Sequence, residues 1–370
     1  MTKRRGRGEG AIFLHPKGLW CASLTIGYDE KGIRKRRYVY GKTKKEVQNK
    51  LIEMHSASAS GTLVNPKRMR LAEYLKHWLE DIMRTSIRPT TFVLYEALIR
   101  LHINPHLGGI ILNSLNAAQI QHLYRELENN KASLRTQAKT YAILRKSLGQ
   151  ANRLGYIQQN PCLLVQKPRY IRKPIHFWNN EQVRHFLKIA ETDRLYPLYI
   201  LALTTGMRLG ELLALQWQDV DLTTGSVSVQ RIAYEINGKI SLGEPKTAKG
   251  RRKIELPNIT MDALKIHRNK MASETDSVLL FCDTHGSYLR QSNLRRRSFE
   301  PLIVKSGLPK IRFHDLRHTA ATLLLSKGIH PKVVQERLGH AQISMTLDVY
   351  SHVLPSMQKE AAAQLETLLK

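Results

Sequence analysis

The first 60 residues alternate between short apolar runs and turn sequences before a helical pattern begins. Three runs of β-branched, aromatic and apolar residues predict strands over residues 11–14, 19–26 and 33–40. From residue 43 to about residue 55, apolar side chains recur at helical spacing, namely at Val47, Leu51 and Met54. We therefore expect a small domain over residues 1–60, built from a three-stranded sheet and one helix.

Small residues then replace the apolar pattern. The run over residues 56–61 contains only Ser, Ala and Gly and has no turn chemistry. We interpret it as linker, which continues through the Asn-Pro pair at residues 65–66. In the division of the chain into domains, residues 61–69 separate the first domain from the second.

The residues that follow carry four successive apolar stripes of helical period. The first stripe consists of Leu71, Tyr74, Leu75, Trp78, Leu79 and Ile82. The second helix begins near Pro89 and is expected to stop before Pro105. Asn116 is the predicted N-cap of the third helix and Ser133 that of the fourth. Four amphipathic helices with short connections predict a compact bundle over residues 70–166.

A basic, proline-punctuated stretch over residues 167–174 predicts a second linker. The last domain, residues 175–370, opens with helices, passes through a strand patch near residues 226–257 and returns to helices. The fold is therefore expected to be mainly α with small β parts. It comprises an N-terminal three-stranded sheet plus helix, a helical bundle and a mixed α/β domain.

Lysine and arginine outnumber aspartate and glutamate by 59 to 30, which gives a formal net charge of +29. The excess is spread along the chain, and no apolar run approaches the roughly 20 residues that a membrane span needs. A polyanion is thus a better partner than a membrane surface, and nucleic acid is the usual polyanion. Residues 1–60 alone hold 14 Lys or Arg against 5 acidic residues. A basic sheet that enters a DNA groove is expected there.

Cysteine usage indicates the compartment. Cys21, Cys162 and Cys282 show neither the spacing of a zinc site nor the even number of a disulfide framework, so we expect buried or half-buried thiols. The charged N-terminal residues are not followed by an apolar segment of signal length, and no secretory signal is predicted. The protein is expected to work in a reducing cytoplasm.

Polar residues with chemical potential gather towards the C-terminus. His314 and Arg317 lie three apart at the start of a helical run, so their side chains share one face. Gly339 and His340 interrupt a second helical run, and Tyr350 follows ten positions after that histidine. Two imidazoles, a guanidinium and a phenol on short elements suit a site that holds a phosphodiester and attacks it with a tyrosine oxygen.

The H-x-x-R, L-G-H and Tyr elements, in this order, resemble the C-terminal signature of the tyrosine recombinases, also called phage-type integrases. Residues 205–212, TGMRLGEL, are similar to the first arginine motif of that family. The resemblance implies that Arg208 is catalytic, and Glu211, three residues further on, can orient its guanidinium.

A lysine completes the resemblance. Residues 244–252, EPKTAKGRR, lie between two predicted strands, and the family places its catalytic lysine in this turn. The Lys-Thr pair points to Lys246, and Lys249 is the competing choice. The catalytic set that the resemblance implies is thus Arg208, Lys246, His314, Arg317, His340 and Tyr350.

The resemblance implies DNA cleavage and rejoining without a metal or a nucleotide cofactor. The tyrosine attacks a DNA phosphorus and forms a 3′-phosphotyrosyl ester, which preserves the bond energy for rejoining. The two arginines grip non-bridging oxygens, and His340 donates a further hydrogen bond. His314 assists proton transfer from the phenol, and the lysine protonates the departing 5′ oxygen. No Walker A loop occurs in the chain.

The same resemblance implies how the domains divide the work. Residues 1–60 would form an arm-type DNA-binding domain, residues 70–166 a core-type DNA-binding domain and residues 175–370 the catalytic domain. The expected partner is double-stranded DNA, bound by a homo-tetramer, and the family also allows for accessory DNA-bending or excision factors. A terminal apolar stripe either folds back on its own domain or docks on a neighbouring protomer, and it comprises Met357, Ala361, Leu365, Leu368 and Leu369.

The residues also bear on three alternative functions. A DNA-binding regulator on the same scaffold would have no reason to keep the six catalytic residues together. A zinc hydrolase could use His314 and His318, but Asp315 is shorter than the required glutamate and Arg317 would place a charge beside the ion. Chromosome-dimer resolvases commonly lack a domain like residues 1–60. An integrase that integrates and excises a prophage or an integrative conjugative element is therefore favoured.

Overall fold

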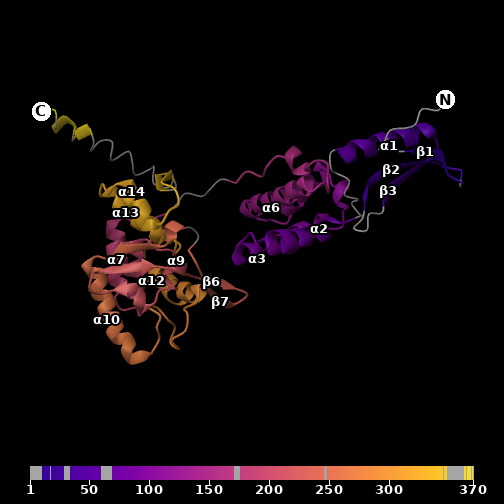
Figure 1. Ribbon diagram of the computed structural model, residues 1–370. Coiled ribbons are helices and arrows are strands. Elements are labelled where there is room, and N and C mark those ends of the chain that lie inside the picture. The colour runs from indigo at the N-terminus through magenta and orange to yellow at the C-terminus, as the bar shows by residue number, and fades with distance from the viewer. Residues whose placement is uncertain are drawn as a thin grey trace. The chain divides into compact units, whose positions relative to one another are not determined.

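The computed structural model describes residues 11–16, 18–28, 34–59, 69–170, 176–245, 248–344, 346–347, 362–363, 365–367 and 369. The chain divides into two compact units, Met1–Ile171 and Arg172–Lys370, and each is treated separately (Figure 1). Helices dominate both units, and the strands form three small sheets among the described residues. No helix in this part of the chain is both long and apolar enough to cross a membrane. The expected fold class, mainly α with small β parts, is confirmed.

The N-terminal residues form a sheet covered by one helix, as predicted. Strands β1 (Ala11–Leu14), β2 (Trp20–Tyr28) and β3 (Arg34–Gly41) are antiparallel and lie in that order. Helix α1 (Lys44–Ala59) packs on the sheet through the buried side chains of Ala22, Leu24, Val47 and Leu51. The expected linker start at residue 56 is wrong, because residues 56–59 belong to α1. Alanine costs a helix nothing and serine little, so the helix continues through this run.

The remainder of the first unit is a set of helices. They are α2 (Leu71–His77), the π-helical turn η1 (Trp78–Met83), α3 (Pro89–Leu98), the π-helical turn η2 (Ile99–Ile103), α4 (Asn104–Leu107), the short 3-10 turn η3 (Leu112–Ser114), α5 (Ala117–Asn129), α6 (Leu134–Arg153) and the 3-10 turn η4 (Pro161–Leu164). Both predicted N-caps are present: Asn116 Oδ1 accepts from the Gln119 backbone N–H at 3.0 Å, and Ser133 Oγ from that of Thr136 at 3.1 Å.

The expected helix end before Pro105 is wrong. Helical backbone runs from α3 through η2 into α4, and Pro105 stands in the first turn of α4. A proline is tolerated there because a first-turn N–H has no partner within its own helix. The apolar stripes predicted for the four helices do form one core, around Leu71, Tyr74, Leu75, Trp78, Ile120, Leu123, Leu144 and Leu148.

The second unit surrounds a buried helix. Its elements are α7 (Asn180–Ala190), α8 (Tyr196–Thr205), α9 (Leu209–Leu212), η5 (Trp217–Asp219), β4 (Val220–Asp221), β5 (Ser226–Val229), β6 (Ile232–Ile236), β7 (Lys239–Gly243), η6 (Ala248–Gly250), β8 (Arg252–Glu255), α10 (Asn258–Glu274), α11 (Gln291–Leu294), η7 (Arg295–Phe299), α12 (Glu300–Ser306), α13 (Asp315–Ser326) and α14 (Pro331–Leu338). Almost every residue of α8 is buried, and Tyr199 contacts the rings of Phe186, Phe299 and Phe313.

The predicted strand patch forms two sheets. Strands β4, β5 and β8 make one antiparallel sheet, whereas β6 and β7 form a separate hairpin. The loop that contains both candidate lysines therefore leads from the hairpin to the three-stranded sheet, and it is not the turn of a hairpin. Lys246 and Thr247 of this loop lie outside the described residues.

Gly206 places the end of α8 beside two other helices. The residue has φ +64, in the left-handed region that favours glycine. A Cβ at this position would collide with the Leu338 side chain of α14 and lie 3.6 Å from Ala320 of α13. The C-terminal end of α8 thus meets α13 and α14. His314 and Arg317 lie at the start of α13, and His340 follows the end of α14.

Candidate functional site

Arg208 stands at the N-terminal end of α9, directly after the end of α8. Its backbone N–H donates to Glu211 Oε2 at 2.9 Å, and its Nη1 donates to Glu211 Oε1 at 2.7 Å. The pairing expected from the spacing of the two residues is confirmed. The Arg208 side chain is 38% exposed, whereas that of Glu211 is 1% exposed. A guanidinium oriented from behind in this way keeps its outer face open to an anion.

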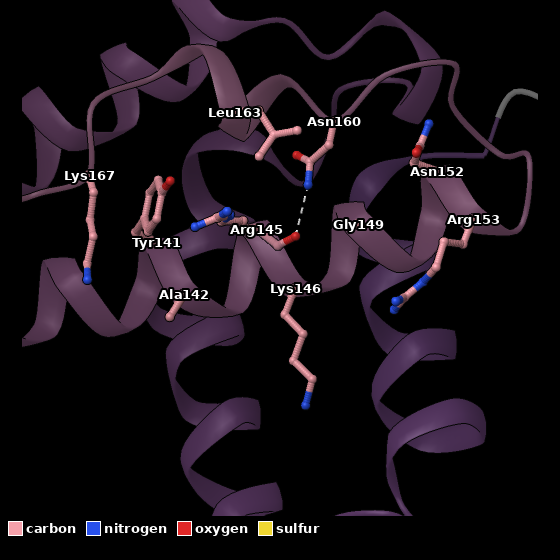
Figure 2. A pocket seen from close by; sticks show the side chains of 10 residues that line it. All are labelled: Tyr141, Ala142, Arg145, Lys146, Gly149, Asn152, Arg153, Asn160, Leu163 and Lys167. Atoms are coloured by element: carbon pink, nitrogen blue, oxygen red, sulfur yellow. Dashed lines mark hydrogen bonds between the residues drawn. The ribbon is translucent and has the colours of Figure 1, made fainter.

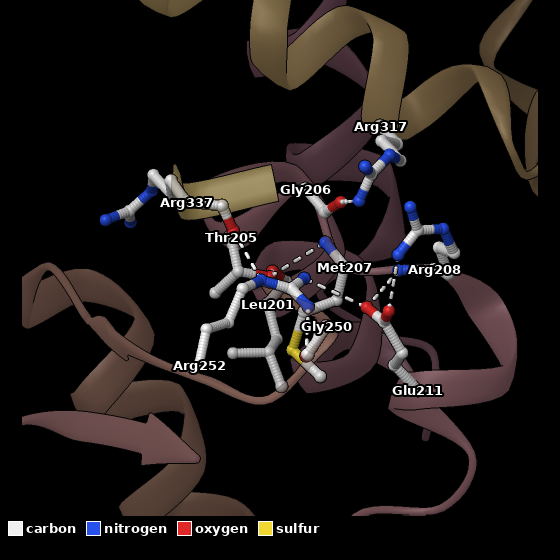
Figure 3. Close-up of polar contacts among 10 residues, drawn as sticks. All are labelled: Leu201, Thr205, Gly206, Met207, Arg208, Glu211, Gly250, Arg252, Arg317 and Arg337. Carbon is white, nitrogen blue, oxygen red and sulfur yellow. Dashed lines mark hydrogen bonds and ion pairs between the residues drawn. The ribbon is translucent and has the colours of Figure 1, made fainter. Parts of the chain in front are cut away.

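Glu211 is a buried carboxylate held between two guanidinium groups. Arg252 Nη2 donates to Glu211 Oε2 at 2.9 Å from the side opposite Arg208 (Figure 3). Burial acts to raise the pKa of Glu211, but the two arginines outweigh it and lower that pKa below its ordinary value. The carboxylate is therefore ionised at neutral pH, and the trio retains one net positive charge.

Arg317 is brought to the same place by α13. Its Nη1 donates to the backbone oxygen of Gly206 at 2.7 Å, and the residue is 3% exposed (Figure 3). Gly206 and Arg208 are only two residues apart, so the end of α8 carries one arginine and orients the other. Two planar cationic groups next to one another suit the non-bridging oxygens of a phosphodiester.

His314 and His318 stand one helical turn apart at the start of α13. Their ring centroids are 5.1 Å apart with an edge-to-face angle of 86°. Partial desolvation, together with the neighbouring His318 and Arg317, lowers the pKa of His314 to about 4, although the residue remains exposed on one side. The imidazole is thus neutral at pH 7. The intervening Asp315 is engaged elsewhere, because its carboxylate accepts from Arg312 Nε at 3.0 Å and Nη2 at 2.7 Å.

His340 follows the left-handed Gly339 at the end of α14, as the L-G-H pattern predicts. The residue is 9% exposed, and its Nδ1 lies 2.9 Å from the hydroxyl of the fully buried Thr346. Its backbone oxygen accepts from Gln335 Nε2 at 3.0 Å. Burial, followed by the charges of Arg317 and Arg208, lowers the pKa of His340 to about 3. The histidine therefore lies in the field of both arginines.

Four of the six predicted catalytic residues are thus gathered around the end of α8, namely Arg208, His314, Arg317 and His340. Lys246 and Tyr350 lie outside the described residues. The competing lysine, Lys249, is described, and its Nζ donates to the backbone oxygen of Ala341 at 3.0 Å. Lys249 therefore holds the turn that follows His340.

Sequence reasoning missed three residues of the site: Thr346, Arg337 and Arg252. Arg337 Nη2 donates to the backbone oxygens of Thr204 at 2.8 Å and Glu255 at 2.9 Å, which ties α14 to α8 and β8. The sequence pattern assigns Arg252 to the basic loop of residues 244–252. Strand alternation could have found it, because Arg252 shares the inward face of β8 with the buried Ile254.

The pKa of His340 leads to a prediction on stability. The folded protein binds no proton at this residue until the pH approaches 3, whereas an unfolded histidine titrates near 6.5. Unfolding therefore takes up a proton below pH 6.5, and the free energy of unfolding decreases as the pH falls. One such group contributes at most about 1.4 kcal/mol per pH unit. We expect His340→Gln, which does not titrate, to lose stability less steeply than wild type between pH 6.5 and 4.5. Chemical denaturation at several pH values measures this, and parallel curves would contradict it.

The sequence matches two family models. The model of the phage integrase family matches residues 176–357, and that of the phage integrase N-terminal SAM-like domain matches residues 70–127. A XerC-like tyrosine recombinase of Caldanaerobacter subterraneus subsp. tengcongensis is 32% identical over 95% of this chain and 97% of its own length. The ICEBs1 integrase of Bacillus subtilis is 27% identical over 76% of this chain and 79% of its own length.

Solved structures share the fold. The Tn1549 transposon integrase, in complex with transposon right end DNA, has a TM-score of 0.70 at 23% identity and covers 82% of this chain and all of that one. A lambda integrase from a tetramer bound to a Holliday junction has a TM-score of 0.59 at 18% identity and covers 90% of this chain and 95% of its own. Together with the arginine-histidine site, the family models and the XerC-like relative identify the protein: the chain belongs to the phage integrase family of tyrosine recombinases, enzymes that cleave and rejoin DNA.

Proposed function

We propose that this tyrosine recombinase cuts and rejoins specific DNA sites through Tyr350 to integrate and excise a mobile element. The observation that carries the proposal is the convergence of Arg208, His314, Arg317 and His340 at the end of α8. These residues come from three separate segments of the sequence. They provide cationic and hydrogen-bonding groups for one phosphodiester, with neutral imidazoles beside them.

The arginines are assigned to the phosphate. As the Tyr350 oxygen forms its bond to phosphorus, negative charge grows on the non-bridging oxygens. Arg208 is supported from behind by Glu211, and Arg317 by the Gly206 backbone oxygen, so both guanidiniums are preorganised before DNA arrives. Preorganised donors need no rearrangement at the moment of reaction.

The histidines are assigned to two roles. His314 takes part in proton transfer, and His340 donates a hydrogen bond. His314, neutral because its pKa is about 4, can accept the proton that the tyrosine hydroxyl loses. A neutral imidazole donates from only one of its nitrogens. We assign the Thr346 hydroxyl as the donor to His340 Nδ1, which leaves the Nε2 proton of His340 for a phosphate oxygen.

Lys246 is assigned as the acid that protonates the departing 5′ oxygen. Cleavage then produces a 3′-phosphotyrosyl ester and a free 5′ hydroxyl, and the reverse attack of a 5′ hydroxyl rejoins the strand. The bond from Lys249 Nζ to the Ala341 backbone oxygen supports this choice of Lys246, since it engages the competing lysine.

Double-stranded DNA is the proposed partner, bound as a homo-tetramer with accessory DNA-bending or excision factors. We assign arm-type sites to residues 1–60, core-type sites to residues 70–166 and catalysis to residues 175–370, with linkers at 61–69 and 167–174. A hollow of about 560 Å³ along α6 supports the core-type assignment (Figure 2). It is lined by the exposed cations Arg145, Lys146, Arg153 and Lys167, which suit a phosphate backbone.

A prophage or an integrative conjugative element is the proposed substrate. Similar proteins named as an ICEBs1 integrase and a Tn1549 transposon integrase support it. The three cysteines are free and buried, as expected, which is in keeping with action in a reducing cytoplasm. Of the predicted terminal stripe, Leu365 and Leu369 are described and are 58% and 85% exposed. The other members lie outside the described residues, and docking of the tail on a neighbouring protomer stays a proposal.

The function is tested by covalent capture. Full-length protein is incubated with short random-sequence duplexes, so that a cleaved fragment with a free 5′ hydroxyl diffuses away and traps the adduct. The protein is denatured and the attached DNA is sequenced. We expect one shared sequence, joined through its 3′ phosphate. DNA that is bound but never covalently attached would favour the DNA-binding regulator instead.

Deleting residues 1–60 is expected to weaken binding to one class of site and to leave cleavage at the other class intact. The reason is the net charge of +9 in this segment, which supplies phosphate contacts independently of the catalytic unit. Footprinting of the full-length and truncated proteins on the end of the element measures the effect. Identical footprints would show that the segment does not bind DNA.

A further inference from the structure

Arg252 is a buried arginine at the start of β8 whose side chain is 7% exposed. It donates three hydrogen bonds in three directions (Figure 3). Nε donates to the Arg337 backbone oxygen at 2.7 Å, Nη1 to the Gly250 backbone oxygen at 3.0 Å, and Nη2 to Glu211 Oε2 at 2.9 Å. The three acceptors belong to α14, to the loop of residues 244–250 and to α9. We call residues 244–250 the lysine loop.

The planar guanidinium carries its donors in fixed directions, so the three segments are held in one geometry. A lysine at the same place offers a single charged nitrogen on a flexible stem and cannot reproduce this arrangement. The charge of Arg252 is also required, because the ionised Glu211 beside it is 1% exposed. Removing the guanidinium would leave a buried carboxylate that is shared with Arg208 alone among its described cationic partners.

Gly250, whose backbone oxygen accepts a hydrogen bond from Arg252, lies at the end of the lysine loop. A Cβ on Gly250 would come within 2.5 Å of Pro245 Cβ, so these two residues are in close contact across the loop. Lys246 follows Pro245 directly in the chain. A shift of Gly250 would therefore disturb Pro245, the residue that precedes Lys246 in the sequence.

The turn that carries His340 rests on the same guanidinium. A Cβ on Gly339 would lie 3.0 Å from Arg252 Nη1 and 3.0 Å from the Lys249 backbone oxygen. A side chain at position 339 would press against Arg252 and the loop backbone, and its φ of +68 also favours glycine. The lysine loop, the His340 turn and the support of Arg208 therefore share one buried contact point.

We propose that Arg252 is a positioning residue for the leaving-group step, because it sets the lysine loop relative to the arginines and His340. The proposal rests on the proposed function. In the step concerned, the Tyr350 oxygen bonds to phosphorus while the bond from phosphorus to the 5′ oxygen breaks, and a lysine-loop ammonium gives its proton to that oxygen. Misplacing the loop should slow proton donation more than phosphate binding.

The test compares two leaving groups at the cleavage site found by covalent capture. One substrate has the natural 5′ bridging oxygen and the other has sulfur at that position. A thiolate is a much weaker base than an alkoxide and departs without protonation, so acid catalysis is unnecessary for the sulfur substrate. Single-turnover cleavage of both substrates is measured with full-length wild type, Arg252→Lys, Arg252→Gln, Lys246→Ala and Lys249→Ala. DNA affinity and thermal unfolding are followed for each protein.

We expect Arg252→Lys to slow cleavage of the oxygen substrate by about 100-fold, the lower end of what general acid catalysis contributes. The sulfur substrate should restore cleavage close to the wild-type rate, as for Lys246→Ala, and DNA affinity should change little. Arg252→Gln extends the comparison to a side chain without charge. The matched control is Arg231→Met, which removes another partly buried arginine ion pair, that of Arg231 Nη1 with Asp219 Oδ2. The Arg231→Met variant should change the cleavage rates of the oxygen and sulfur substrates by the same factor.

Suppose that wild type and Lys246→Ala behave as described. The proposal is then overturned if the Arg252 variants cleave both substrates more slowly by the same factor, or cleave both at the wild-type rate. Rescue of Lys249→Ala in place of Lys246→Ala would move the acid within the lysine loop and still support Arg252 as its anchor. A wild-type protein that forms no adduct on either substrate would overturn the proposed function, and this inference with it.

Discussion

Tyr350→Phe is expected to abolish covalent attachment to DNA and to leave DNA binding close to that of wild type. The substitution removes only the nucleophilic oxygen, and no other tyrosine follows Tyr288 in the chain to replace it. Binding depends on many lysine and arginine contacts with the phosphate backbone, which the substitution does not touch. A suicide substrate that carries a nick near the cleavage site, run on a denaturing gel, measures the adduct.

Tyr288→Phe is the matched control for this experiment. Tyr288 packs beside a small apolar cluster of Met271, Leu279 and Cys282, apart from the arginine site. Its variant should form the adduct at the wild-type rate. An adduct that persists in Tyr350→Phe would place the nucleophile elsewhere in the chain and would require the C-terminal motif to be reinterpreted.

Arg317→Lys is expected to slow strand cleavage on the order of 100- to 1000-fold, the effect of losing one preorganised donor at a developing charge. Arg317 uses Nη1 to hold the Gly206 backbone oxygen, and its planar guanidinium carries further N–H donors in fixed directions. A lysine has one nitrogen and cannot reproduce this arrangement. Single-turnover cleavage gives the rate, and DNA affinity should change far less.

The same experiment is run with and without excess chelator. We expect chelator to leave wild-type cleavage unchanged, because the arginines, His340 and Lys246 supply the charge stabilisation that metal ions supply in many nucleases. Arg312→Lys is the matched control for Arg317→Lys, because Arg312 lies on the same segment but pairs with Asp315. This control should cleave at close to the wild-type rate. If chelator stops the wild-type reaction, the metal-free mechanism is wrong and the pair His314 and His318 returns as a ligand site.

Much of the secondary structure was predictable because its causes are local. The caps at Asn116 and Ser133 depend on side chains that reach backbone groups three residues away. The helical stripes of the bundle depend on a repeat of 3.6 residues, and they form the core as predicted. The placement of His314 and Arg317 at the start of one helix likewise needs only their spacing.

Local signals failed where packing or backbone geometry beyond the pattern decided the outcome. Pro105 was expected to end a helix, but the π-helical turn before it brings the proline into the first turn of α4. The Ser-Ala run at residues 56–59 was expected to be linker and is helix, because its composition tolerates both states. The strands on either side of the lysine loop were predicted correctly, yet the sheets to which they belong were not.

The sequence by itself determined the family, the mainly helical fold class, the excess of basic residues along the chain and the chemical types of the catalytic residues. Their proximity was inferred from resemblance and not from any local rule. Only the tertiary structure decided that the end of α8 lies against α13 and α14, where the Gly206 oxygen meets Arg317. Only it decided that Arg252 is buried and joins Glu211, Gly250 and α14. The physical reason is that spacing along the chain encodes contacts within a helix or a strand, whereas contacts between distant segments depend on how whole elements pack.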